Sequence, residues 1–280
     1  MKTKKITTKM LQEFRAFLLE NEKSKATLAK YLHDVQCFIT FAAEKNIDKA
    51  LLLEYKAMLG QQYAAASANS MIAALNAFLR QQGWYELCIR QFRVQKSVYC
   101  SEEKELTKAE YRQLLRTAER RKDKRLSLVL QTICCTGIRV SELACITVED
   151  VRRGEATVRC KGKTRSVFIV RELQRRLLQY AAAHGLTQGP VFLSRRGTPL
   201  SRCMIWREMK ALCAEAGVPP TKVFPHNLRH LFARTFYGLE KDIAKLADIL
   251  GHSSIDTTRI YIVTTGTEHR RKMENLHLLL

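Results

Sequence analysis

Residues 155–169 read EATVRCKGKTRSVFI, and the apolar pattern of the chain changes its period within them. The pattern takes a period of two over residues 157–160 (TVRC) and over residues 166–169 (SVFI), which predicts two β-strands. The segment between them, from Lys161 through Gly162 to Lys163, is typical of a hairpin turn. Because the spacing on both sides of this hairpin is helical, the sequence predicts a mainly α fold with a small antiparallel β-sheet.

Helical patterns extend from the hairpin in both directions. On its N-terminal side, Thr107 and Glu110 have the spacing of a helix-capping box. On its C-terminal side, Gly251 has the position of a helix-ending glycine. The helices predicted around the hairpin are 108 to beyond 115, 126 to a stop at 137, 171–184, 201–215, 225–238 and 242–250.

The first 95 residues contain helical patterns and little else. Apolar residues keep to one face after the starts at Thr7 and Thr27, and a third stripe, residues 71–79, ends before Gly83. The apolar period then lapses in VQKSVYCSEEKE, residues 94–105. We therefore predict a helical N-terminal domain over 1–95, a linker over 96–105 and a second domain over 106–280.

The chain has a formal net charge of +21 and a pI near 9.8. Such an excess of cation favours a polyanionic partner, because phosphates neutralise the self-repulsion. We expect nucleic acid rather than a membrane, since no apolar run reaches the ~18 residues of a spanning helix and no signal-like segment follows the lysine-rich start. Nine scattered cysteines without a CxxC pair suggest neither zinc nor a redox dithiol. We expect a cytoplasmic, nucleoid-associated protein without a cofactor.

Three motifs in the second predicted domain carry residues for phosphate chemistry: TGIRVSEL at 136–143, PHNLRH at 225–230 and LGHSSIDTTRIY at 250–261. Displacement at a phosphodiester needs a nucleophile that loses its proton and donors for the charge on the phosphate oxygens. Arginine stays charged and presents a planar fork of donors, so Arg139 and Arg229 are suited to hold one phosphate. A single arginine is most often a surface ion-pair residue, and only the combination favours this role.

His226 and Arg229 are three residues apart on a predicted helix and therefore project from one face. His226 can accept or relay a proton near neutral pH. His226 and His230 also have the spacing of zinc ligands in metalloproteases, but that motif requires glutamate after the first histidine, and Asn227 stands there. We therefore predict no metal site, and we expect His230 to be a packing residue or a support for its neighbours.

His252 directly follows Gly251, where a side chain can point into a cleft, although a histidine in this place also caps helices or lies on the surface. Tyr261 lies in a segment rich in hydroxyl groups. A phenolate attacks phosphorus, and its phosphate ester keeps enough group-transfer energy for a sugar hydroxyl to reverse the step. The motifs therefore indicate that Tyr261 cuts and rejoins a phosphodiester without ATP.

Together these motifs resemble those of the tyrosine recombinases, the phage-integrase type of site-specific recombinases, and the resemblance extends over essentially the whole chain. It implies an N-terminal helical core-binding domain of the SAM-like type and a mixed α/β catalytic domain. It also implies a metal-independent reaction in which Tyr261 forms a 3′-phosphotyrosyl link and releases a 5′-hydroxyl. By the same resemblance, four protomers on two double-stranded DNA sites exchange strands through a Holliday junction, in DNA integration, excision or inversion.

The resemblance assigns roles by position. Arg139 and Arg229 would stabilise the pentacoordinate phosphate. His226 would assist proton transfer at Tyr261, and His252 would donate to a non-bridging oxygen.

The family's catalytic lysine lies on a hairpin turn, commonly within GKGxKxR, where it protonates the leaving 5′-oxygen. This chain has CKGKTR, which is one residue shorter and lacks the leading glycine. Lys161 aligns with the catalytic lysine, and Lys163 is the alternative. Glu142 matches the family's acidic support for the first arginine, and Val263 stands where many members have a histidine.

The tail, residues 267–280, carries an apolar set that includes Met273 and Leu276. It resembles the C-terminal helix that such recombinases dock into a neighbouring protomer, with an ordinary intramolecular helix as the alternative.

Two other functions use the same motifs. Type IB topoisomerases have a similar residue set but rejoin the same strand, and the helical N-terminal domain favours a recombinase over them. A DNA-binding regulator on an inactivated scaffold should have lost at least one of these residues, and none is missing.

Overall fold

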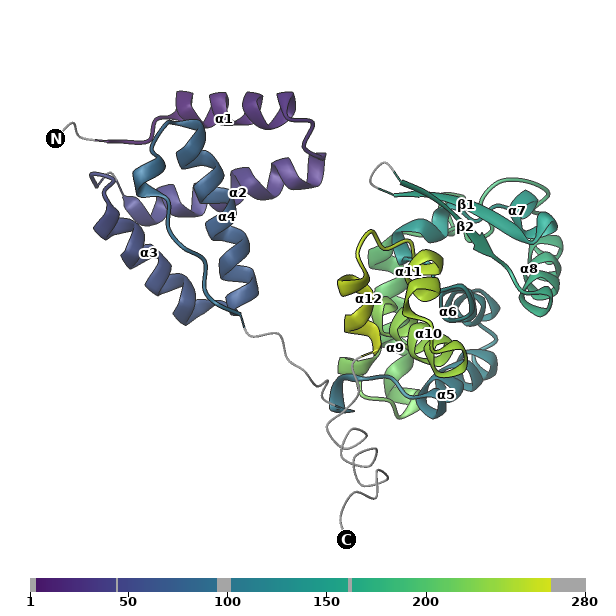
Figure 1. Cartoon of the computed structure of the whole chain (residues 1–280). Helices are drawn as coiled ribbons and strands as arrows, with labels where there is room; N and C mark the ends of the chain where they lie inside the picture. The colour runs from purple at the N-terminus through teal and green to yellow at the C-terminus, as the bar shows by residue number, and fades with distance from the viewer. Residues whose placement is uncertain (1–3, 44, 95–101, 161–162, 263–280) are drawn as a thin grey trace, which may run out of the picture. The chain divides into compact units, whose positions relative to one another are not determined.

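The chain divides into two compact units, Met1–Lys96 and Ser97–Leu280, in the computed structural model (Figure 1). The structure describes residues 4–43, 45–94, 102–160 and 163–262, and for residues 159, 160 and 163 it describes the backbone alone. Each unit has its own hydrophobic core. Helices dominate both units, and the two strands of the described residues form one antiparallel sheet, which confirms the predicted fold class.

Unit 1 is built from helices whose starts are set by polar caps. The side chains of Thr7, Ser24 and Asp48 each accept a hydrogen bond from a backbone N–H of the first helical turn. The second helix begins earlier than predicted because Ser24, and not Thr27, is its cap. The elements of unit 1 are α1 (Thr8–Glu20), α2 (Lys25–Ala42), α3 (Lys49–Gln62), α4 (Ala65–Gln81) and the 3-10 turn η1 (Tyr85–Leu87).

The predicted apolar stripes of unit 1 meet in one core. Phe14 of α1 packs edge-on against Phe78 of α4, with ring centroids 5.3 Å apart, and Phe38 of α2 packs on Tyr55 of α3 at 5.0 Å. All four rings are buried. The polar faces therefore point outward and carry the basic residues of this unit.

Unit 2 contains all six helices that were predicted for it, together with shorter elements that were not. The helices α7 and α12 were not predicted. With six residues, α7 is too short to show a helical stripe in sequence, and the hydroxyl-rich segment of α12 has no clear apolar face. The elements of unit 2 are η2 (Glu102–Lys104), α5 (Lys108–Arg120), α6 (Lys124–Thr136), η3 (Val140–Cys145), α7 (Val148–Arg153), β1 (Glu155–Cys160), β2 (Lys163–Phe168), α8 (Arg171–Ala183), α9 (Arg202–Ala216), η4 (Pro220–Lys222), α10 (Pro225–Glu240), α11 (Ile243–Leu250) and α12 (Ile255–Ile262).

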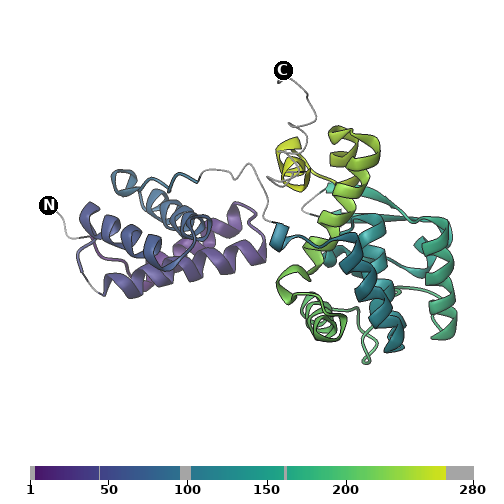
Figure 2. The ribbon, with the colours of Figure 1, turned by 90° about the horizontal axis from the view of Figure 1, so that it is seen from below.

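The β-hairpin is antiparallel, with Glu155 opposite Phe168 and Cys160 opposite Lys163. The predicted strand boundaries need a correction. Lys163 is the first residue of β2 rather than part of the turn, because the pairing continues to the end of β1. Ile169 has left the strand, and its N–H donates to the carbonyl of Gly154 at 2.8 Å. The helices α7 and α8 lie beside the hairpin at one end of the unit, and α12 lies toward the other (Figures 1 and 2).

Gly137 lets three helices approach one another. It ends α6 with φ at +62°, a conformation that favours glycine. A Cβ at this position would lie 2.5 Å from Phe232 of α10 and 2.9 Å from Leu250 of α11. The glycine of the TGIR sequence is therefore required by packing as well as by backbone conformation.

The last residues of the predicted linker belong to unit 2. Glu105 forms an ion pair with Arg234 of α10, and Leu106 is buried in the core of the unit. The carbonyl of Lys104 accepts a hydrogen bond from Asn227 at 2.7 Å. The polar residues from which a linker was predicted here form contacts with α10.

Candidate active site

The three motifs meet in unit 2. The TGIRVSEL motif runs from the end of α6 into η3, PHNLRH forms the first turns of α10, and LGHSSIDTTRIY connects the end of α11 to α12. α10 packs against α6, α11 and α12, so segments that are distant in sequence become neighbours (Figure 1). Pro225 begins α10, where its missing N–H has no helical partner to lose.

Tyr261 lies on α12 and is buried, with 6% of its surface exposed. Its ring centroid is 4.3 Å from that of His230, 5.2 Å from His252 and 5.4 Å from His226. The guanidinium carbon of Arg229 lies 5.9 Å from the same ring. The tyrosine is therefore surrounded by three imidazoles and one guanidinium of its own chain.

Arg229 is a buried cation, with 1% of its surface exposed. Nη1 donates to the carbonyl of Gly137, and Nη2 donates to the carbonyl of Leu250 at 2.7 Å and to Nε2 of His252 at 3.0 Å. Within the described part of the chain, Nε is buried without an acceptor. Burial, followed by the charge of Arg139, lowers the pKa of Arg229 to about 10, and Tyr261 offsets part of this effect. The guanidinium keeps its charge at neutral pH and favours an anionic partner.

Arg139 directly precedes η3, and Glu142 holds it. Nη1 of Arg139 donates to Oε1 of Glu142 at 2.9 Å, and the backbone N–H of Arg139 donates to Oε2 at 3.0 Å. Arg165 of β2 donates to the same Oε2 at 2.7 Å. Burial alone raises the pKa of Glu142, but these hydrogen bonds and the two arginine charges outweigh it, so the pKa is lowered. The carboxylate stays ionised and orients Arg139, whose side chain remains 33% exposed.

His252 has a defined tautomer. Its Nε2 lies 3.0 Å from Nη2 of Arg229, which can only donate, so Nε2 must be the acceptor. Nδ1 then carries the proton and donates to Oγ1 of Thr258 at 2.8 Å. Burial, followed by the charges of Arg229, Arg139 and Arg165, lowers the pKa of His252 to about 4. The ring is therefore neutral at pH 7, and a bound anion that offsets these charges would raise its pKa.

His226 and His230 are neutral for similar reasons. Burial, together with the charges of Arg229 and Arg139, lowers the pKa of His226. Burial, the neighbouring His226 and Arg229 lower that of His230 to about 4. The two rings are 4.8 Å apart, and His226 keeps an exposed surface at the start of α10. A neutral His226 beside Tyr261 is able to accept a proton.

The free protein should lose stability on acidification through these histidines. In the unfolded chain a histidine binds its proton near pH 6.5, whereas the folded pKa values of His230 and His252 are about 4. The unfolded state therefore binds more protons between these values, so this stabilisation is complete above pH 6.5 and is lost as pH falls to about 4. We expect His252→Asn to unfold with a melting temperature that depends less on pH in this window than that of the wild type. Equal slopes for the two proteins would contradict a depressed pKa at His252.

An open depression of about 760 Å³ adjoins this group of residues. Arg139 and His252 line it from two sides, and Val158 and Thr164 contribute the edge of the hairpin. The exposed part of the first arginine thus faces the same hollow as the late histidine. A phosphate that entered there would meet both donors.

Neither candidate lysine of the hairpin has a described side chain. Lys161 is outside the described residues, and for Lys163 only the backbone is described, at the start of β2. Val263 and the tail, residues 267–280, are also outside them. The other residues assigned from the motifs, Arg139, Glu142, His226, Arg229, His252 and Tyr261, come together in unit 2.

Two residues of this site, Arg165 and Thr258, were not predicted from the sequence. Arg165 contacts Glu142, and the only sequence signal for it is the final arginine of the hairpin motif. Thr258 is fully buried and accepts the Nδ1 proton of His252, but nothing distinguishes it from the neighbouring hydroxyl residues in sequence. Asn227 is buried and donates to the carbonyls of Lys104 and Lys222, which gives this position a structural role.

Among the described residues, no group of three or more His, Cys, Asp or Glu side chains is placed to hold a metal ion. In the same part of the chain, every helix is too short or too polar to cross a membrane.

Relatives of known function share the sequence along its length. Residues 104–267 match the model of the phage integrase family, and residues 11–82 match that of the phage integrase N-terminal SAM-like domain. Tyrosine recombinase XerA of Pyrococcus furiosus is 30% identical over 289 aligned residues, which cover 100% of this chain and 98% of the relative. Tyrosine recombinase XerC of Herpetosiphon aurantiacus is 28% identical, with 90% and 89% covered.

Solved structures show the same fold. A crystal structure of XerA recombinase is 25% identical, with a TM-score of 0.55 over 98% of this chain and 100% of that chain. A lambda integrase tetramer bound to a Holliday junction is 20% identical, with a TM-score of 0.73 over 90% of this chain and 76% of that chain. Since the integrase model covers more than half of the sequence and XerA matches all of it, this chain belongs to the phage integrase family, that of the tyrosine-type site-specific DNA recombinases.

Proposed function

We propose that this chain cuts and rejoins DNA at specific sites through a 3′-phosphotyrosyl intermediate. The phenolic oxygen of Tyr261 forms a bond to phosphorus, and the bond from phosphorus to the 5′-oxygen breaks. The 5′-hydroxyl of a partner strand then attacks the phosphotyrosyl bond and releases the tyrosine. The observation that carries this proposal is the position of Tyr261 beside Arg229 and three neutral histidines within one chain.

The two arginines form the clamp for the phosphate oxygens. Arg229 holds the carbonyl of Gly137, two residues before Arg139, so the two cations are tied to one loop. Glu142 neutralises only part of the charge of Arg139 and Arg165, which leaves a net positive site for the anionic transition state. Donors fixed in advance need little reorganisation when charge develops.

His226 and His252 have different roles: one accepts the proton of the phenol, and the other donates to the phosphate. His226 takes the phenolic proton as Tyr261 attacks, because it is neutral and its ring lies beside the phenol. In the DNA-free protein, Nε2 of His252 accepts from Arg229 and cannot donate. A phosphate oxygen that takes over Nη2 of Arg229 and offsets the arginine charges would raise the pKa of His252. His252 then gains a proton on Nε2 and donates it to the non-bridging oxygen.

A lysine of the hairpin protonates the leaving oxygen, and we assign this role to Lys161, with Lys163 as the alternative. We expect Lys161→Ala to slow cleavage of an ordinary DNA strand by about two orders of magnitude, the scale of one general acid. A strand with sulfur at the scissile 5′ position should be cleaved almost normally, because a thiolate leaves without a proton. Lys163→Ala is the matched control. If only Lys163→Ala shows this rescue by sulfur, the assignment moves to Lys163.

The assembly we propose is four protomers on two double-stranded DNA sites that exchange strands through a Holliday junction. The net charge of +21 suits a DNA partner, and a related lambda integrase was solved as a tetramer on such a junction. An apolar groove of about 380 Å³ between α5 and α10, which Leu231 and Phe236 help to line, offers a place for the tail of a neighbouring protomer. Cytoplasmic location at the nucleoid follows from this role.

The deciding experiment incubates the protein with two DNA sites in the presence of EDTA. We expect recombinant products, a covalent protein–DNA species and no requirement for a metal or ATP. Relaxation of a supercoiled plasmid without strand exchange would favour a topoisomerase instead. Binding without any covalent species would favour a DNA-binding regulator, and activity that magnesium restores after EDTA would contradict the mechanism.

A further inference from the structure

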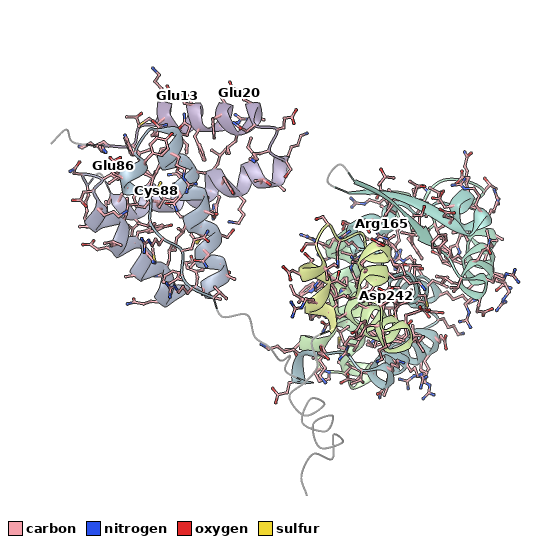
Figure 3. All side chains as sticks on the ribbon, in the orientation of Figure 1. Glu13, Glu20, Glu86, Cys88, Arg165 and Asp242 are labelled. Carbon is pink, nitrogen blue, oxygen red and sulfur yellow. The ribbon has the colours of Figure 1, made fainter. Side chains whose placement is uncertain are left out.

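Arg165 enters the mechanism above only through its charge, yet it touches the segments that carry the site. Nη2 donates to Oε2 of Glu142 at 2.7 Å, and Nη1 donates to the carbonyl of Ile249 at 3.1 Å. Its side chain is 11% exposed. Figure 3 labels this residue on β2, on the side of the hairpin that faces α11. One guanidinium therefore joins the hairpin to η3 and to the end of α11.

The stem of Arg165 also lies across Gly251, the residue before His252. A Cβ at position 251 would lie 2.3 Å from Cδ of Arg165 and 2.8 Å from Nε. The φ of Gly251 is +65°, so both the backbone and the arginine exclude a side chain here. The close contact fixes the position of the arginine relative to the backbone that leads into His252.

This contact bears on the hairpin because an isolated two-stranded hairpin is only marginally stable in water. Its place in the molecule is set by what it packs against. Val158 and Val167 are buried in the core of unit 2, and Arg165, which pairs with Val158, adds a polar anchor two residues closer to the turn than Val167. A guanidinium suits this position because its planar fork reaches two acceptors at fixed angles.

We propose that Arg165 is a positioning residue, which holds the hairpin and its lysine in register with the Arg139–Glu142 pair and His252. It acts through the lysine that protonates the leaving oxygen, while its own guanidinium is held by Glu142 and the carbonyl of Ile249 at the wall of the hollow that Arg139 and His252 also line. This inference rests on the proposed function, because it assumes that a hairpin lysine is the general acid.

The first test compares Arg165→Gln with wild type in single-turnover cleavage of a nicked DNA duplex at saturating protein. We expect the cleavage rate to fall by about tenfold or more, since misplacing a catalytic group by about 1 Å reaches 10²-fold. DNA affinity should stay near that of wild type. The melting temperature should fall, because the variant loses the bonds to Glu142 and to the carbonyl of Ile249, so cleavage is measured well below it. Arg175→Gln on α8, an exposed arginine paired with Glu172, loses the same charge and should cleave normally. Arg165→Lys should recover only part of the rate, because one ammonium does not reproduce the fork.

The second test separates positioning from general structural damage. Arg165→Gln is combined with alanine at whichever lysine shows rescue by sulfur, and all four proteins are assayed with oxygen and sulfur leaving groups. We expect the Arg165 substitution to slow cleavage much less in the lysine variant, and much less on the sulfur strand, because the acid is then absent or unnecessary. Should Arg165→Gln fail to fold, Arg165→Lys takes its place in the same cycle.

Two results would overturn the inference: wild-type cleavage by Arg165→Gln, or an equal loss with and without the lysine and with both leaving groups. A wild-type protein that forms no covalent complex would instead remove the proposed function itself. The two failures are therefore distinguishable.

Discussion

Tyr261→Phe should form no covalent complex with a nicked DNA duplex, while wild type accumulates one. The substitution removes only the phenolic oxygen, which is the atom that bonds to phosphorus. The ring keeps its contacts with His230 and Arg229, so we expect stability to change by less than about 1.5 kcal/mol, the upper range for one hydrogen-bonding group. Salt-dependent DNA binding should be nearly intact, because it depends on the basic surface.

Tyr237→Phe is the matched control, since Tyr237 of α10 packs against the same small apolar cluster as Tyr261. We expect this variant to trap DNA like the wild type. Covalent trapping by Tyr261→Phe would disprove that Tyr261 is the nucleophile. A mixture of Tyr261→Phe and Arg229→Ala protomers should remain inactive, because the tyrosine of each chain lies beside its own arginine. Restored cleavage in the mixture would show that the tyrosine attacks in a neighbouring protomer's site.

The features of this site that could be predicted from the sequence are those whose signals lie within a few neighbouring residues. His226 and Arg229 are three residues apart on a helix, so their shared face follows from helical geometry alone. Gly251 was predictable as a helix end because its left-handed φ is a local requirement. The hairpin was also predictable, because its strand pattern and its turn are local in sequence. Its register was not.

The contacts between segments were not predictable from the residues themselves. The resemblance assigns Glu142 to Arg139, which is three residues away, but the bond of Glu142 to Arg165 spans 23 positions. The proton on Nδ1 of His252 depends on Thr258 and on the long-range approach of Arg229. These contacts arise from the packing of α10 against α6, α11 and α12, which no local pattern specifies.

The free site also differs from the one that the motifs imply. The resemblance assigns His252 as a donor to the phosphate, whereas the structure has it neutral and accepting from Arg229. Both descriptions hold if DNA completes the site, because the phosphate charge opposes the arginine charges that lower the pKa of His252. His252 is then protonated in the complex with DNA and neutral in the free protein.

Arg229→Ala should both slow cleavage and destabilise the fold, whereas Arg139→Ala should mainly slow cleavage. Each variant removes a donor to the phosphate, so we expect each to slow single-turnover cleavage by about 10²–10³-fold, as the loss of one oxyanion donor does in other enzymes. Arg229→Ala should also destabilise the fold by several kcal/mol. It leaves the buried carbonyls of Gly137 and Leu250 without this donor, at about 1–3 kcal/mol for each unsatisfied group.

Arg139→Ala should destabilise the protein less, because the side chain is 33% exposed and Glu142 keeps its bond to Arg165. Thermal or urea unfolding therefore distinguishes the pair, and cleavage is measured well below both melting temperatures. Full activity after either substitution would remove that arginine from the site. An Arg229→Ala protein as stable as Arg139→Ala would contradict the bridging of α6 and α11 by Arg229. Both arginines face a phosphate in this proposal, but only the buried one also holds together the helix ends on which His252 and Tyr261 depend.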